Sequence, residues 1–125
     1  FIQQEVDYIV LAPVTETGWD TVLQEAKDAG IPVIIVDRMV DVSDDSLYTA
    51  WVGSNFKLEG QKAMAWLDAY LEAKGRGDED INLVDIQGTI GASAQIGRTE
   101  GFDEAVEAHD NWNTIAQQSG EFYTG

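Results

Sequence analysis

Short, uninterrupted apolar runs alternate along this chain with longer stretches in which apolar residues recur every three or four positions. Continuous runs at residues 8–12 and 32–36 are typical of buried strands, and we predict that the first is a central parallel strand covered on both faces. Residues 81–88 predict a further strand. A more polar run at 48–52 predicts a strand nearer a sheet edge, and residues 112–120 predict a last strand. These runs define the strands of the predicted fold.

Helical spacing fills the stretches between the predicted strands. Thr17 and Asp20 can form a capping box at the start of the first helix, and Gly30 ends that helix. A long amphipathic helix is predicted over residues 56–71, and another helix over 94–106. Alternating strands and helices indicate an α/β fold, a doubly wound parallel sheet with right-handed crossovers.

Both ends of this pattern are interrupted. Residues 1–7 look like the end of an amphipathic helix, and the chain stops after a strand, where a further crossover helix is expected. We therefore expect this sequence to be a fragment of a longer chain. Sheets that lack strands expose edges that invite pairing between copies, so self-association of the fragment is an outcome to test.

The charge balance narrows the class of partner. Seven Lys and Arg residues stand against 23 Asp and Glu residues, which gives a net charge of −16. A field of this sign repels phosphate backbones and anionic headgroups, so nucleic acid is not an expected partner. The acidic residues are spread over helix faces and turns, which is typical of a solvated surface.

The residue types that carry most enzyme chemistry are scarce in this chain. It has no Cys and a single His, His109, so we expect no disulfide framework, zinc cluster or Ser-His triad. No general acid, base and nucleophile are predicted to converge, and we expect no catalysis, no metal and no cofactor. Core packing, rather than stacking on a ligand, is the expected role of the tryptophans, which are Trp19, Trp51, Trp66 and Trp112.

Two opposite charges directly follow one of the buried runs. Asp37 and Arg38 come at the carboxyl end of the strand predicted at 32–36, and ligands of open parallel sheets bind beyond that end. A strand-end salt bridge or a helix-capping Asp is the structural alternative. Arg98 lies near the N-terminus of its predicted helix, where a cation opposes the helix dipole. That position favours a functional reason over a surface pair with a neighbouring Glu.

Three stretches of the sequence resemble one protein family. "VDYIVLAPVTETGWDTVLQEAKDAGIPVIIVDR", "VGSNFKLEGQKA" and "IQGTIGASAQIGRTEGFDEAVEAH" are similar, in order and separation, to the ribose- and galactofuranose-type solute-binding proteins of bacterial ABC sugar importers. The resemblance runs the whole chain and implies a two-lobed periplasmic-binding-protein fold that clamps a sugar between its lobes. It implies that residues 1–53 are the second half of the N-terminal lobe and residues 54–125 the first half of the C-terminal lobe.

The resemblance also implies roles for particular residues. Asp37 and Arg38 are expected to bind the sugar from the first lobe, and Arg98 is expected to reach it from the second. Thr15 and Glu16 are expected at the mouth of the cleft, where a ligand contact and a plain loop role are equally open. Charged donors and acceptors suit sugar hydroxyls, because these both donate and accept hydrogen bonds.

The implied function is solute binding for an importer. The expected partners are a monosaccharide (galactofuranose, fructose, arabinose or ribose) and the membrane permease of the transporter. Ala12 stands where ribose-specific members carry Asn, so ribose itself is in doubt. The implied location is periplasmic, or extracellular as a membrane-anchored lipoprotein in a Gram-positive organism.

Two other functions use similar folds. The same lobes serve as the effector-binding domains of sugar-responsive repressors of the LacI type, which a basic DNA-binding segment upstream would reveal. A phosphoryl-accepting receiver domain with Asp37 as acceptor needs two further carboxylates at the preceding strand end, where this chain has Ala12 and Pro13. The receiver is therefore disfavoured, whereas the repressor stays open.

Overall fold

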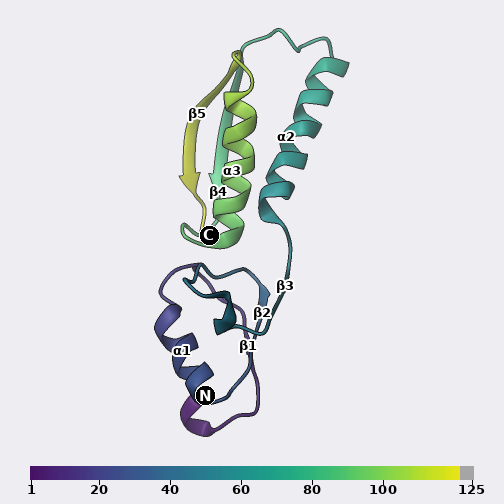
Figure 1. Cartoon of the computed structure of the whole chain (residues 1–125). Coiled ribbons are helices and arrows are strands. Elements are labelled where there is room, and N and C mark those ends of the chain that lie inside the picture. The colour runs from purple at the N-terminus through teal and green to yellow at the C-terminus, as the bar shows by residue number, and fades with distance from the viewer. Residues whose placement is uncertain (122–125) are drawn as a thin grey trace. The chain divides into compact units, whose positions relative to one another are not determined.

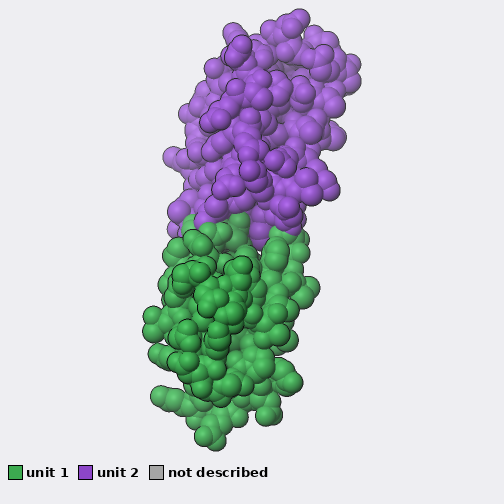
Figure 2. Space-filling model, in the orientation of Figure 1, with its two compact units in different colours: residues 1–54, 91–93 green, residues 55–90, 94–125 purple. Residues whose placement is uncertain are grey.

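The computed structural model describes residues 1–121, and its elements follow the predicted alternation of strands and helices (Figure 1). The chain divides into two units (Figure 2). Unit 1 consists of residues 1–54 together with 91–93, and unit 2 of residues 55–90 together with the described residues from 94 on. The first change of unit follows residue 54, and residues 91–93 belong to unit 1 again. That the units are halves of two lobes stays a prediction.

Unit 1 is a three-stranded parallel sheet with a helix on one face. Its strands are β1 (Ile9–Leu11), β2 (Val33–Asp37) and β3 (Ala50–Gly53), and they lie in the order β1-β2-β3. Helix α1 (Asp20–Asp28) connects β1 to β2, and short 3₁₀ helices cover Ile2–Gln4 and Asp45–Leu47. Because Leu11 pairs with Ile35 and Asp37 with Gly53, the carboxyl ends of neighbouring strands meet at one edge.

The core of unit 1 forms where α1 covers β2. Ile35 is fully buried, and Leu23 and Ala26 of α1 pack in the same cluster as Val33. Alternate strand residues point to the opposite face of the sheet, which leaves Val10 exposed. The β-branched run of β2 therefore fixes the centre of the unit, as its sequence predicts.

Two details of unit 1 differ from the sequence-based expectations. Among the described strands β1 lies at the sheet edge rather than at the centre, because only β2 has a strand on both sides. The predicted capping box is wrong: Trp19 is the residue before α1, and no side chain caps that helix end. The Asp20 carboxylate instead accepts hydrogen bonds from the backbone N–H and the hydroxyl of Ser43, at 2.9 and 2.8 Å.

Unit 2 pairs two parallel strands with two helices. Its elements are α2 (Phe56–Ala73), β4 (Ile81–Gln87), β5 (Trp112–Ser119) and all of α3 (Ser93–Glu107) except the first residue, which belongs to unit 1. The side chain of Asn55 starts α2 by accepting a hydrogen bond from the Leu58 N–H at 3.0 Å. Both helices contribute to a buried cluster against the sheet, whose most buried members are Met64, Leu71, Ile81 and Trp112.

The tryptophans divide between the core and the surface. Trp112 is buried and stacks on the His109 ring with 3.8 Å between the ring centroids, as expected for core residues. Trp66 is 66% exposed and stacks on Tyr70 along the outside of α2, so the expectation that it packs in the core is wrong. Within residues 1–121 no helix is both long and apolar enough to cross a bilayer.

Candidate ligand-binding site

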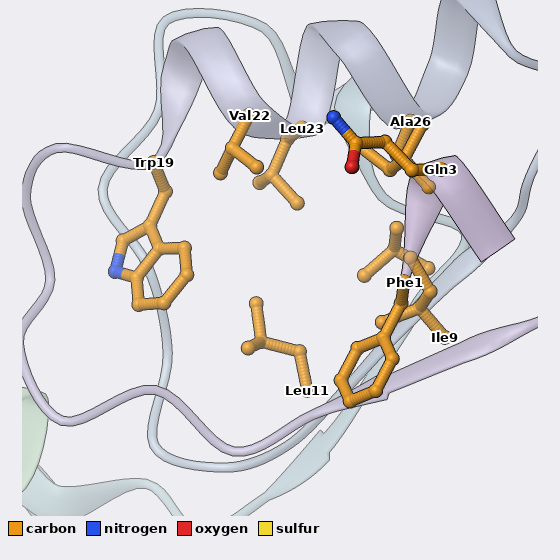
Figure 3. Close-up of a pocket in the computed structure, with 10 residues that line it drawn as sticks. Phe1, Gln3, Ile9, Leu11, Trp19, Val22, Leu23 and Ala26 are labelled. Carbon is orange, nitrogen blue, oxygen red and sulfur yellow. The ribbon is translucent and has the colours of Figure 1, made fainter.

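A well-formed hollow in unit 1 is apolar and does not suit a sugar. It has a volume of about 280 Å³ and lies between α1, β1 and the first residues of the chain (Figure 3). Leu11, Trp19 and Leu23 line it, and Gln3 is the polar side chain drawn at its rim. Sugar hydroxyls placed there would lose their water without gaining partners, which is unfavourable. The polar residues predicted to bind ligand lie elsewhere.

Asp37 occupies the carboxyl end of β2 in an unusual backbone conformation. Its φ is +65°, in the left-handed region that non-glycine residues rarely adopt, although Asp is among the side chains that tolerate it. Within residues 1–121 no hydrogen bond or ion pair involves its exposed carboxylate. Within the described part of the chain, Asp37 therefore neither caps a helix nor forms a salt bridge. The carboxylate is presented to solvent at the carboxyl end of the strands, where open parallel sheets generally bind their ligands.

Gly53 and Trp51 hold the Asp37 backbone in place. Gly53 pairs with Asp37 across the strands, and a Cβ at Gly53 would collide with the Asp37 carbonyl oxygen. The indole N–H of Trp51 donates a hydrogen bond to the same oxygen at 3.2 Å. Neither role was predicted, although a Gly that ends a strand beside a candidate residue is a signal of close backbone approach.

Arg38 joins the two neighbouring strand ends of unit 1. Its Nη1 donates a hydrogen bond to the Val14 carbonyl, in the loop that follows β1, at 3.3 Å. The next two residues of that loop are the predicted Thr15 and Glu16, both half-buried. Arg38, Thr15 and Glu16 therefore belong to the same edge of the sheet as Asp37, so the four residues predicted for the first lobe are brought together.

Backbone hydrogen bonds fix the loop that carries Thr15 and Glu16. The Trp19 indole N–H donates to the Thr15 carbonyl at 2.8 Å. The Glu16 N–H donates to the Gly91 carbonyl at 2.9 Å, and the Glu16 carbonyl accepts from the Asp41 N–H at 2.8 Å. Gly91 has φ +88°, which suits glycine. These hydrogen bonds therefore hold the loop, called the rim below, in one conformation.

Arg98 belongs to unit 2 and is already engaged there. Its Nε donates a hydrogen bond to Glu59 Oε2 at 3.1 Å, and its Nη2 lies 3.0 Å from the same oxygen. The guanidinium carbon lies 5.2 Å from the centre of the Phe56 ring. The structure thus contains the pair with a Glu that the sequence offered as the alternative, but the partner is 39 residues away on α2 rather than a neighbour in sequence.

A second ion pair links the same two helices. Lys57 Nζ lies 2.6 Å from Glu104 Oε1, and Gln61 donates to the other oxygen of that carboxylate at 2.9 Å. The hydrogen bond from Lys57 holds the pKa of Glu104 below its ordinary value of 4.5, and the same bond raises the pKa of Lys57 above 10.5. Both groups therefore stay charged across the range between those values.

His109 has structural contacts in unit 2. Its Nδ1 lies 2.6 Å from the Ala105 carbonyl oxygen, and its Nε2 lies 3.3 Å from a carboxylate oxygen of Asp68. Among the described residues no group of three or more His, Cys, Asp and Glu side chains is arranged to hold a metal ion. The chemistry that the candidate residues offer is hydrogen bonding by a carboxylate and guanidinium groups.

Comparison with known proteins identifies the family. The family model described as "Periplasmic binding protein domain" matches residues 1–124. The galactofuranose-binding protein YtfQ of Escherichia coli (strain K12) is 46% identical over 98% of this chain and 37% of its own length. The fructose import binding protein FruE of Bifidobacterium longum (strain NCC 2705) is 50% identical over 99% of this chain and 36% of its own length.

A solved structure agrees with this comparison. The periplasmic binding protein component of the arabinose ABC transporter from Shewanella sp. ANA-3, bound to α- and β-L-arabinofuranose, is 44% identical and superposes with a TM-score of 0.86. The alignment covers 98% of this chain and 38% of that one, so the chain spans little more than a third of the length of these relatives. The match over nearly every residue and the parallel α/β units agree, and the chain belongs to the periplasmic binding protein domain family.

Proposed function

We propose that the complete protein carrying this chain is the sugar-binding component of an ABC importer. The observation that carries the proposal is Asp37, the last residue of β2, which Arg38 follows. Its backbone is in the left-handed region, and within residues 1–121 its carboxylate has no hydrogen-bond or ion-pair partner. Strained backbone of this kind concentrates at binding sites. A carboxylate and a guanidinium on successive residues supply an acceptor and donors of the kind that neighbouring sugar hydroxyls need.

The sugar we propose is a monosaccharide, with a furanose form favoured. The relatives described above are named for galactofuranose and fructose, and the Shewanella protein is named as bound to arabinofuranose. Ala12 supplies no side-chain donor or acceptor at the end of the β1 segment, which disfavours ribose. Thr15 and Glu16, in the rim beside Arg38, are proposed as further contacts.

We propose that Arg98 of unit 2 contributes to the same ligand. Three hydrogens of its guanidinium, two on Nη1 and one on Nη2, are not used by the hydrogen bond and the close contact with Glu59.

The proposed partners are the monosaccharide and the importer's permease, and the proposed location is outside the cytoplasmic membrane, with a lipid anchor in a Gram-positive organism. The relatives described here favour the importer over the repressor alternative.

Calorimetric titration of the complete protein with galactofuranose, arabinose, fructose and ribose tests this function. We expect saturable heat with at least one of these sugars and no turnover of it. Asp37→Asn should weaken that binding about 30- to 1000-fold, or about 2–4 kcal/mol, because sugar hydroxyls then lose a charged acceptor. Absence of heat with all four sugars would contradict the proposal, as would unchanged affinity of the Asp37→Asn variant.

A further inference from the structure

We infer that Glu59 is a positioning residue that acts through Arg98. This inference rests on the proposed function for the identity of the ligand. It states that Glu59 holds the guanidinium in one orientation, so that its free end is presented ready to bind. The sequence singled out Arg98 but gave no role to Glu59, which lies in the first turn of α2.

The geometry of the pair leaves one end of the guanidinium available. Glu59 engages the edge formed by Nε and Nη2, through a single carboxylate oxygen at 3.1 and 3.0 Å. Within the part of the chain that the structure describes, no hydrogen bond or ion pair uses Nη1 of Arg98. Because an arginine has five donors in a fixed planar fork, fixing one edge also fixes the direction of the others. Glu59 therefore orients Arg98 without occupying its binding end.

The ring of Phe56 restricts the remaining freedom of the guanidinium. Its centre lies 5.2 Å from the guanidinium carbon, which is within the range of a cation–π contact. Phe56 is buried, whereas about half of the Arg98 side-chain surface is exposed. The guanidinium thus rests on a fixed surface, is held along one edge, and stays accessible on the rest.

Close packing of α2 and α3 fixes the backbone positions of the residues in this arrangement. A Cβ on Gly60 would come within 2.5 Å of the Arg98 carbonyl oxygen and 3.0 Å of its Cα. A Cβ on Gly97 would come within 2.8 Å of the Phe56 Cβ. Only glycine permits such an approach of two helix backbones, which brings the Arg98 backbone directly against the turn that carries Phe56 and Glu59.

Fixing a long side chain before binding removes part of the entropy that binding would otherwise cost. An unrestrained Arg98 would sample many rotamers, most of which direct Nη1 away from a given hydroxyl. Loss of the Glu59 carboxylate should therefore lower affinity by a modest factor, about 3- to 10-fold, the range expected for one immobilised side chain. Loss of Arg98 itself should lower affinity further, because it removes the donors.

A double-mutant cycle in the complete protein separates this role from a general effect of charge. We expect Glu59→Gln to weaken sugar binding about 3- to 10-fold in the natural background and not at all in the Arg98→Ala background, because it acts only through Arg98. Glu100→Gln is the matched control, since it removes the same charge from an exposed position two residues from Arg98. The inference is overturned by equal losses in both backgrounds, by no loss with Glu59→Gln, or by an equal loss with Glu100→Gln.

A second measurement decides the positioning role without any sugar. The Nε–H signal of Arg98 in a nitrogen-15 NMR spectrum, identified by its absence in Arg98→Ala, reports how freely the guanidinium moves. We expect its order parameter to fall in Glu59→Gln and to stay unchanged in Glu100→Gln. An unchanged order parameter in Glu59→Gln overturns the inference even if sugar binds. If the unmodified protein binds none of the four sugars, the proposed function fails, and this comparison still decides whether Glu59 orients Arg98.

Discussion

At the scale of single residues, the conformation of Asp37 links the fold to the proposed function. A left-handed φ costs most non-glycine residues about 1–2 kcal/mol, and Gly53 and Trp51 hold the backbone there from the neighbouring strand. The sequence predicts a carboxylate at this strand end because Asp37 directly follows the buried β-branched run of β2. It could not predict the sign of φ, because Asp is compatible with both regions of backbone space.

Substitutions at Asp37 should separate stability from binding. We predict that Asp37→Ala is less stable than Asp37→Gly by about 1 kcal/mol, since alanine resists the left-handed conformation and glycine does not. Urea denaturation of the complete protein measures this difference, with calorimetry run in parallel. Both variants should lose sugar binding alike, because both lack the carboxylate. Equal stability of the two variants would show that the left-handed conformation is not maintained in solution.

At the scale of elements, three glycines determine how closely α2 and α3 pack. They are Gly60, Gly97 and Gly101, and the last two are four residues apart and so share one helix face. A Cβ on Gly101 would meet the Gln61 nitrogen at 2.6 Å and the Lys57 oxygen at 2.7 Å. These are backbone atoms, which cannot turn away as a flexible side chain would.

We predict that Gly101→Ala destabilises the protein by about 1–3 kcal/mol, the usual cost of overpacking. The direction of the change in unfolding free energy is informative, because alanine at an unobstructed helix position stabilises a protein by about 1 kcal/mol relative to glycine. Thermal unfolding measures the change. Lys62→Ala is the control on the exposed face of α2 and should have almost no effect. A higher melting temperature for Gly101→Ala would mean that the helices are not in close contact.

Sequence patterns predicted the elements well because strand runs and helical spacing are local signals. The ends of α2 and β2 fall close to the predicted positions for this reason. The capping box at Thr17 was wrong because Asp20 bonds to Ser43, 23 residues away, and local patterns do not report such a partner. The pairing of Glu59 with Arg98 was missed for the same reason, although the glycine spacing in α3 is a signal that this helix approaches another closely.

At the scale of the whole molecule, unit 1 depends on a short segment that is distant in sequence. The hydroxyl of Ser93 accepts a hydrogen bond from the Met39 N–H at 2.8 Å, just beyond Arg38. The Gly91 carbonyl oxygen likewise accepts a hydrogen bond from the Glu16 N–H. Residues 91–93 thus satisfy backbone donors on two of the loops that carry the candidate ligand-binding residues.

We predict that Ser93→Ala destabilises the protein by about 1–3 kcal/mol, because the half-buried Met39 N–H then lacks an acceptor. Amide hydrogen exchange should show faster exchange at Met39, and urea denaturation should show the lower stability. Ser54→Ala provides the matched control at an exposed position, where about 0.5 kcal/mol or less is expected. If both serine variants behave alike, the Ser93 hydroxyl does not support the loop.

The insertion of residues 91–93 into unit 1 also constrains how this protein can be divided or recombined. The polypeptide passes from one unit to the other after residues 54, 90 and 93. A protease that cut within residues 53–55 would give two polypeptides, and residues 91–93, which complete unit 1, would remain part of the second one. Only their hydrogen bonds, such as those to Met39 and Glu16, would then join them to the first polypeptide. A chimera that exchanged residues 1–54 alone would carry the candidate ligand-binding loops without residues 91–93, which accept hydrogen bonds from the backbone N–H groups of those loops. Chimeras of this family should therefore be built with breakpoints on both sides of residues 91–93 as well as at the first boundary.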